Sequence, residues 1–192
     1  GVALIMSPWN YPFMLTMEPL YGAIAAGNCA VVKPSAYAPA TSAVIRRMLR
    51  ACFPEEYIFA VEGGRAENQA LLDQRFDYIF FTGGVTVGKE VMAKAAKHLT
   101  PVTLELGGKS PCVVDRTAKL ELAANRIAFG KLLNCGQTCV APDYILVERS
   151  VKDEFLVYLK KWIVRMYGAD ATENDAYVKM INRKHFDRVT GL

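Results

Sequence analysis

Short apolar segments alternate with helical patterns along the first half of the chain, and this alternation limits the possible folds more than any other feature. Apolar runs bounded by turn residues read as buried strands, at residues 2–6, 29–33, 57–61, 78–81 and 102–106. Helical patterns separate them, at residues 13–26, 38–52, 66–73 and 86–98. Strands that alternate with helices pair in parallel, with right-handed crossovers and helices on both faces of the sheet. The sequence therefore predicts an α/β fold with a Rossmann-like parallel sheet.

The pattern changes after Pro111. Strands are predicted at residues 112–114 and 144–147, and helices at 120–133, 151–167 and 177–189. A domain boundary is therefore expected between residues 106 and 111. Residues 1–106 would form the Rossmann-like domain, and residues 107–192 would form part of a second α/β domain.

Composition narrows the class of protein. The 192 residues are 52% hydrophobic and 22% charged, without a low-complexity tract or an apolar run long enough to span a membrane. The net charge of +4 is mild and the Lys and Arg residues are scattered, so we expect no nucleic-acid partner. A phosphorylated cofactor would suit this charge as well.

Cysteine usage points to reduced thiols. The five cysteines are an odd number without the spacing of a small secreted scaffold, and no signal peptide precedes Gly1, so we expect a cytoplasmic protein. A metal site at Cys135 and Cys139 would need further ligands, and the only histidines are His98 and His185. No metal is expected.

A carboxylate and a thiol lie at opposite ends of residues 102–144, whose middle can fold back and bring them together. Glu105 ends an apolar strand, and Cys139 lies in a loop with Gly136 before it and Pro142 after it. A covalent thiol enzyme needs such a pair, because the thiolate attacks and a base delivers water to the acyl-enzyme. Burying a lone carboxylate is costly, and partial withdrawal of Glu105 from water would suit a base.

Five motifs, in order, resemble those of the aldehyde dehydrogenase superfamily. The runs SPWNYP, VVKPS and FTGG are similar to its cofactor-domain motifs, ELGGKSP to its general-base motif, and GQTC to its nucleophile motif. The resemblance covers nearly the whole chain. The sequence PVTLELGGKSPC, followed by NCGQTCVAPDY, resembles the class 3 branch of the superfamily. That branch acts on fatty and aromatic aldehydes and accepts NAD or NADP.

The resemblance implies a catalytic role for three residues. Cys139 would be the nucleophile, Glu105 the general base, and Asn10 the side chain that donates to the carbonyl oxygen in an oxyanion hole. Each also has a structural interpretation: Cys139 as an inert buried thiol, Glu105 as a solvent-facing strand end, and Asn10 as a turn residue. Cys135 would support the loop.

The cofactor implied is NAD or NADP, held by the Rossmann-like domain of residues 1–106 and by the residue that follows it. The GG-x-x-x-G run at Gly83 is not the usual dinucleotide fingerprint, but it lies between a strand and a helix, where backbone N–H groups can hold a diphosphate. Lys33 would reach the adenosine ribose or a 2′-phosphate, unless it is an ordinary surface lysine. The cofactor-binding residues implied are Trp9, Lys33, Ser35, Gly83, Gly84, Val87, Gly88, Leu106 and Gly107.

The resemblance also implies a larger protein. Compared with the family, the chain lacks an N-terminal helical region and a later Glu-x-Phe-Gly-Pro segment that contacts the nicotinamide ribose. We expect the complete protein to be a homodimer acting on a small aldehyde, and the isolated chain to be inactive. Two alternatives remain open: an acylating, coenzyme A-dependent dehydrogenase, which would gain nothing from Glu105, and a cofactor-binding fragment without turnover.

Cofactor preference follows from the residues after Lys33. Many family members carry a glutamate there, which binds the adenosine ribose and repels a 2′-phosphate. This chain reads Ser35-Ala36-Tyr37 instead. The sequence therefore predicts that NADP is used at least as well as NAD.

Overall fold

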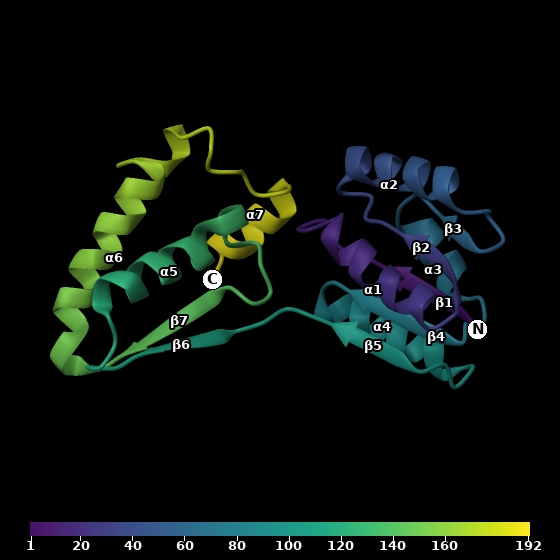
Figure 1. Ribbon diagram of the computed structural model, residues 1–192, viewed down its shortest axis with the longest axis horizontal. Helices are drawn as coiled ribbons and strands as arrows, with labels where there is room; N and C mark the ends of the chain where they lie inside the picture. The colour runs from purple at the N-terminus through teal and green to yellow at the C-terminus, as the bar shows by residue number, and fades with distance from the viewer. The chain divides into compact units, whose positions relative to one another are not determined.

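A computed structural model describes residues 1–192 and divides into two compact units, Gly1–Leu106 and Gly107–Leu192 (Figure 1). The first unit is an α/β layer structure and the second is a smaller α/β unit. Each unit has its own buried core.

The first unit is built on a five-stranded parallel sheet. Its strands, in the spatial order β3-β2-β1-β4-β5, are β3 (Ile58–Ala60), β2 (Cys29–Lys33), β1 (Val2–Met6), β4 (Tyr78–Thr82) and β5 (Val102–Glu105). Its helices are α1 (Met14–Ala25), α2 (Pro39–Cys52), α3 (Arg65–Leu72) and α4 (Val85–Ala96). Every neighbouring pair of strands is parallel. The predicted Rossmann-like α/β sheet is therefore confirmed.

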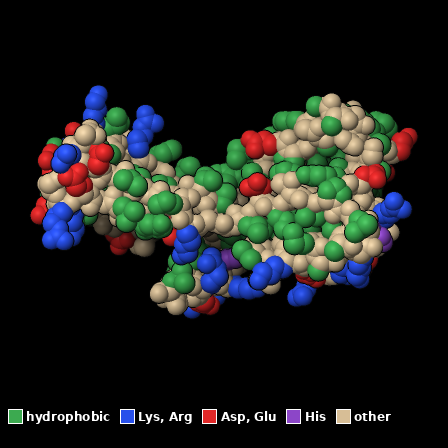
Figure 2. All heavy atoms as spheres, turned by 90° about the horizontal axis from the view of Figure 1, so that it is seen from below, with side chains coloured by type: hydrophobic (Ala, Val, Ile, Leu, Met, Phe, Trp, Pro, Cys, Tyr) green, Lys and Arg blue, Asp and Glu red, His purple; other side chains and the backbone are tan.

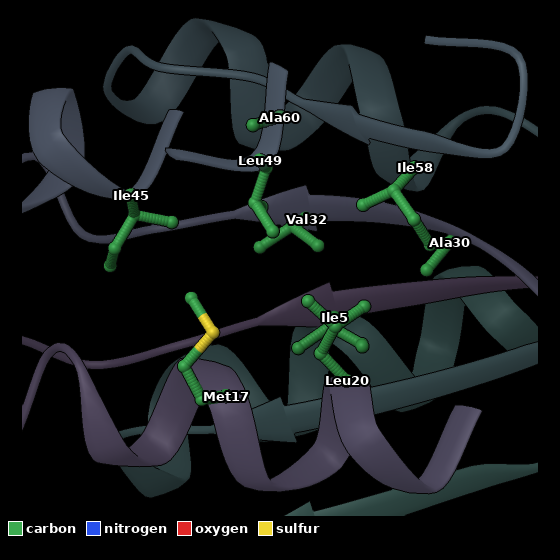
Figure 3. Close-up of a cluster of buried hydrophobic side chains, with 9 residues drawn as sticks. All are labelled: Ile5, Met17, Leu20, Ala30, Val32, Ile45, Leu49, Ile58 and Ala60. Atoms are coloured by element: carbon green, nitrogen blue, oxygen red, sulfur yellow. The ribbon is translucent and has the colours of Figure 1, made fainter. Parts of the chain in front are cut away.

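Successive residues of β1 point to opposite faces of the sheet, as the two-residue period of a strand requires. Ile5 packs with side chains of α1 and α2 on one face, and Figure 3 shows Leu20 of α1 and Leu49 of α2 in that cluster. Leu4 packs on the other face against α3 and α4. Because both faces are covered, the central strand β1 is buried from Ala3 to Met6, which is why its apolar run lacks polar alternation.

The order of the strands creates a switch point between β1 and β4. From β1 the chain moves outward to β2 and β3, then returns to the other side of β1 for β4 and β5. The loops that leave the carboxyl ends of β1 and β4 therefore turn in opposite directions. In open α/β sheets ligands bind outside the carboxyl ends of the strands at such a point.

The second unit has two parallel strands, β6 (Ser110–Val114) and β7 (Pro142–Val147). Its helices are α5 (Leu120–Leu132), α6 (Lys152–Tyr167) and α7 (Arg183–Thr190), with 3₁₀ turns η1 (Leu133–Gly136), η2 (Arg149–Val151) and η3 (Ala171–Glu173). Phe155 of α6 is fully buried against Val114 of β6 and Ile127 of α5. This cluster fixes α5, and therefore the loop that follows it.

The predicted helix at residues 177–189 is wrong in its start. The observed α7 begins at Arg183, where the side chain of Asn182 accepts a hydrogen bond from His185 N (3.0 Å) and caps the helix. Upstream, Ile181 N donates to the side-chain oxygen of Gln137 (3.0 Å). A contact with a distant loop replaces the helical hydrogen bond that the local pattern predicted.

No helix of the chain combines the length and the apolar character needed to cross a bilayer. On the face drawn in Figure 2, acidic as well as basic side chains occur on each unit, among apolar and neutral ones.

Candidate functional site

The loop that leaves β1 carries Trp9 and Asn10, and buried hydroxyl groups hold both of its ends. Ser7 Oγ and Thr16 Oγ1 share a hydrogen bond of 2.5 Å, and Thr16 Oγ1 donates to Pro12 O (2.6 Å). Trp9 and Asn10 are half-buried between these anchors. The loop is therefore fixed at the carboxyl end of a central strand, where the sequence places the oxyanion-hole asparagine.

Lys33 ends β2 beside that loop, and it is not a surface lysine. Its residue is only 3% exposed, and its ammonium donates to Gly63 O (2.7 Å) and Pro34 O (2.9 Å). Burial lowers the pKa of Lys33, and the nearby carboxylate of Glu67 opposes that shift. An ammonium has three N–H donors, so two protein carbonyls leave one for a ligand.

Glu67 is a charged neighbour of Lys33 that sequence reasoning missed. Its carboxylate accepts a hydrogen bond from Gly64 N (2.6 Å) at the start of α3. Hydrogen bonds from its own N–H and that of Gly64, with a smaller contribution from Lys33, hold the pKa of Glu67 below its ordinary value. The sequence did contain a signal for Glu67: it follows Gly64 by three residues, which is the spacing of a capping box at the start of a helix.

Ser35 lies in the turn after Lys33. Its hydroxyl accepts a hydrogen bond from Tyr37 N (3.2 Å), and its carbonyl accepts one from Ser42 Oγ (2.8 Å). Ala36, in the same turn, is exposed. The hydroxyl of Ser35 thus shapes the turn in addition to any contact it makes with a cofactor.

The connection from β4 to α4 presents backbone N–H groups at the carboxyl edge of the sheet. Gly83 N donates to Glu105 O (3.0 Å), which ties the turn to the end of β5. Gly84 is the N-cap of α4 and is exposed, as is Val87 in the first turn. The first N–H groups of a helix lack intrahelical partners and carry a partial positive charge, which suits a diphosphate.

Gly88, in the first turn of α4, is buried against Leu106. A Cβ on Gly88 would lie 2.8 Å from Leu106 Cδ2, so helix and strand end pack tightly there. Gly107 is the first residue of the second unit, and a Cβ added to it would meet no other atom within 4 Å.

Glu105 is the last residue of β5, and its side chain is exposed. The expected withdrawal of this carboxylate from water is therefore wrong for this chain. Glu105 and Asn10 belong to the first unit and Cys139 belongs to the second. A joint role for the three stays a prediction.

The loop that carries Cys139 has an unusual backbone. Asn134 and Cys135 have φ values of 54° and 55°, and Gly136 follows with φ 73°. Three consecutive left-handed residues end α5 abruptly and turn the chain toward the half-buried Cys139. Gly136 has the conformational freedom that the sequence predicted for it, whereas its two neighbours adopt this conformation at a cost.

The general-base motif and the nucleophile motif meet inside the second unit. A Cβ on Gly108 would lie 2.2 Å from the carbonyl oxygen of Cys139 and 3.3 Å from its carbonyl carbon. Only glycine allows the two backbones to approach so closely. Gly108 of the ELGGK motif therefore packs directly on the residue that carries the candidate nucleophile.

Cys135 has a structural partner of its own. Burial raises the pKa of Tyr177 to about 12, and the side chain of Tyr177 also shares a hydrogen bond with Cys135. All five cysteines are free thiols. The chain contains no group of three or more His, Cys, Asp or Glu residues placed to hold a metal ion.

Comparison with known proteins agrees with these features. Residues 1–192 match the aldehyde dehydrogenase family. The chain is 50% identical over its whole length to mouse aldehyde dehydrogenase family 3 member A2, and 49% identical to the rat dimeric NADP-preferring aldehyde dehydrogenase. It spans 40% and 42% of those relatives' lengths.

A solved structure has the same fold. The substrate-bound state of Staphylococcus aureus AldH matches all of this chain with a TM-score of 0.92 and 50% identity, and the chain covers 42% of it. The mouse relative bears out the resemblance to the class 3 branch. Since the family match extends over every residue of both units, the chain belongs to the aldehyde dehydrogenase family.

Proposed function

We propose that the complete protein oxidises an aldehyde to a carboxylic acid with NAD or NADP, and that Cys139 is its nucleophile. The observation that carries this proposal is the packing of Gly108 against the carbonyl of Cys139. A 2.2 Å approach constrains both segments, so the loop holding the thiol has a fixed position relative to Gly108 within the second unit. In the sequence, Glu105 precedes Gly108 by only three residues.

The first step is attack of the Cys139 thiolate on the aldehyde carbonyl carbon. A C–S bond forms, and the carbonyl electron pair moves to oxygen. The Asn10 side-chain amide and the Cys139 backbone N–H donate hydrogen bonds to that oxyanion. Donors fixed before the reaction stabilise developing charge without reorganisation, and one such donor typically contributes about 10²- to 10³-fold in kcat.

NAD or NADP, when bound, supplies the acceptor for the hydride that leaves the tetrahedral carbon. The carbonyl then re-forms, and a thioester remains on Cys139. Glu105 accepts a proton from water as the water oxygen attacks this thioester. Breakage of the C–S bond releases the acid and restores the thiolate. The exposure of Glu105 leaves it accessible to the water that it must activate.

The carboxyl edge of the first unit fits a dinucleotide. Lys33 has one N–H donor left for the ribose or a 2′-phosphate, and the exposed N-terminus of α4 offers N–H groups to the diphosphate. Both lie at the carboxyl ends of strands, where open α/β sheets bind ligands. These features support NAD or NADP as the cofactor.

The substrate class proposed is fatty or aromatic aldehydes, as the class 3 resemblance implies. The rat relative's name describes it as dimeric and NADP-preferring, which supports a homodimer that accepts NADP.

The test is NAD(P)H formation by the complete protein, with long-chain and aromatic aldehydes, in the presence and absence of coenzyme A. We expect turnover without coenzyme A, loss of turnover in Cys139→Ala, and full activity in Cys52→Ala, a matched control at an exposed thiol. Turnover that requires coenzyme A would favour the acylating reaction. Cofactor binding without turnover would show that the protein is not a dehydrogenase.

A further inference from the structure

The nucleophile loop is tied to a later segment of the second unit through one side chain, Gln137. Its amide nitrogen donates to Asn134 O (2.9 Å), within the loop itself. Its amide oxygen accepts a hydrogen bond from Ile181 N (3.0 Å), and its nitrogen also approaches Lys179 O (3.4 Å). We call residues 174–181 the strap, because they lie outside any helix or strand and their backbone is bound to this loop.

The loop needs such support because its backbone is strained. Asn134 and Cys135 both lie in the left-handed region, at φ 54° and 55°. This conformation costs an L-residue on the order of 1–2 kcal/mol, and it persists only where the surroundings determine it. Gln137 binds the carbonyl of Asn134, the first of the strained residues, through both its side chain and its backbone N–H (3.1 Å).

A second contact joins the same two segments. Tyr177 of the strap shares a side-chain hydrogen bond with Cys135, the other strained residue. The ring of Tyr177 also packs edge-on against Tyr167, the last residue of α6, with centroids 4.8 Å apart. Each strained residue therefore has a contact that leads to the strap, and the strap is anchored on a helix of the core.

We propose that Gln137 is a positioning residue, which holds the strained turn against the strap and thereby sets the direction in which Cys139 presents its sulfur. This inference rests on the proposed role of Cys139. Gln137 does not act on the aldehyde itself. Its loss lets the turn relax toward ordinary backbone conformations, so the thiolate and the Cys139 N–H move together away from the substrate carbonyl.

The test compares variants of the complete enzyme. Gln137→Ala is expected to lower kcat about 10- to 100-fold, because a misplacement of the order of 1 Å can cost about 10²-fold. The KM for NAD(P) is expected to stay unchanged, because all of the expected cofactor residues except Gly107 lie in the first unit and Gln137 lies in the second. Alkylation of Cys139 by iodoacetamide should slow in the same variant. The matched control is Gln74→Ala, which removes only an exposed side-chain bond to Ala70 O (3.2 Å).

A second-site variant separates positioning from a general structural role. Asn134→Gly supplies a residue that adopts the left-handed conformation readily. In the Gln137→Ala background it should recover at least about fivefold of the lost kcat, measured well below the melting temperature of both variants, where a difference in stability alone does not change kcat. If Gln137→Ala gives too little folded protein, Gln137→Glu keeps the length and the acceptor for Ile181 N and is compared in the same manner.

Two results would overturn the inference: a kcat for the Gln137 variant within about twofold of the parent, or no recovery on adding Asn134→Gly. Full activity in Cys139→Ala would instead overturn the proposed function. The two failures are therefore distinguishable.

Discussion

Replacing Gly108 with alanine should displace the nucleophile loop. The new Cβ would lie 2.2 Å from the carbonyl oxygen of Cys139, whereas ordinary contact begins at 3.4 Å, so the two backbones must separate by about 1.2 Å. The obstructing atom belongs to the backbone, so no side-chain rotation relieves the clash. A displacement of this size at the reacting group can cost about 10²-fold in rate. We therefore expect kcat/KM for the aldehyde to fall about 100-fold.

The assay is steady-state NAD(P)H formation by the complete enzyme, together with the rate of Cys139 alkylation and a thermal melt. Overpacking typically costs about 1–3 kcal/mol, so the variant should fold and be less stable. Gly22→Ala in α1 is the matched control, because a Cβ there meets nothing within 4 Å and alanine favours a helix. If Gly108→Ala keeps both its kcat/KM and its alkylation rate, the packing of the two motifs does not position the thiol.

Three further predictions address the remaining residues. Cys139→Ala should abolish dehydrogenase activity while leaving cofactor binding intact. Cys135→Ala should be far milder, because it removes only a structural hydrogen bond to Tyr177, and equal losses in the steady-state rate would contradict the assignment. Glu105→Gln should give a burst of NAD(P)H about equal to the enzyme concentration, followed by turnover slowed about 10²- to 10⁴-fold, and unchanged steady turnover would mean that another group activates water. Ala36→Glu should shift the ratio of kcat/KM values toward NAD by about tenfold, or about 1.4 kcal/mol, when both cofactors are measured at fixed ionic strength; no shift would remove the electrostatic argument.

The elements that the sequence predicted well are those whose environment is uniform along their length. The five parallel strands lie within one or two residues of their predicted ends because helices cover both faces of the sheet and each strand is part of a mostly apolar run bounded by turn residues. The residues at the carboxyl edge of the sheet were also predicted, since Lys33 and Glu105 end their strands and Gly83 directly follows one. The local sequence pattern is sufficient for these strands because the residues that define each strand lie within it.

The features that the sequence could not predict depend on partners far along the chain. Burial of Lys33 follows from the carbonyl of Gly63, 30 residues later, and lysine is ordinarily exposed. The start of α7 depends on Gln137, 44 residues before Ile181. The approach of Gly108 to Cys139 likewise joins two motifs that no local rule connects. Such contacts depend on tertiary packing, and the spacing of apolar residues along the chain does not predict them.

The cofactor prediction shows how one such contact changes an argument without reversing it. The sequence favoured NADP because the turn after Lys33 has no acid, yet the carboxylate of Glu67 interacts with Lys33 through space. Glu67 already accepts a hydrogen bond from Gly64 N, and its negative charge acts on Lys33 against the larger effect of burial. Because the negative charge of Glu67 would oppose a 2′-phosphate, we expect NADP to be accepted without a strong preference over NAD. A glutamate at position 36 would add one negative charge in the turn after Lys33, and because like charges repel, that addition should penalise NADP more than NAD.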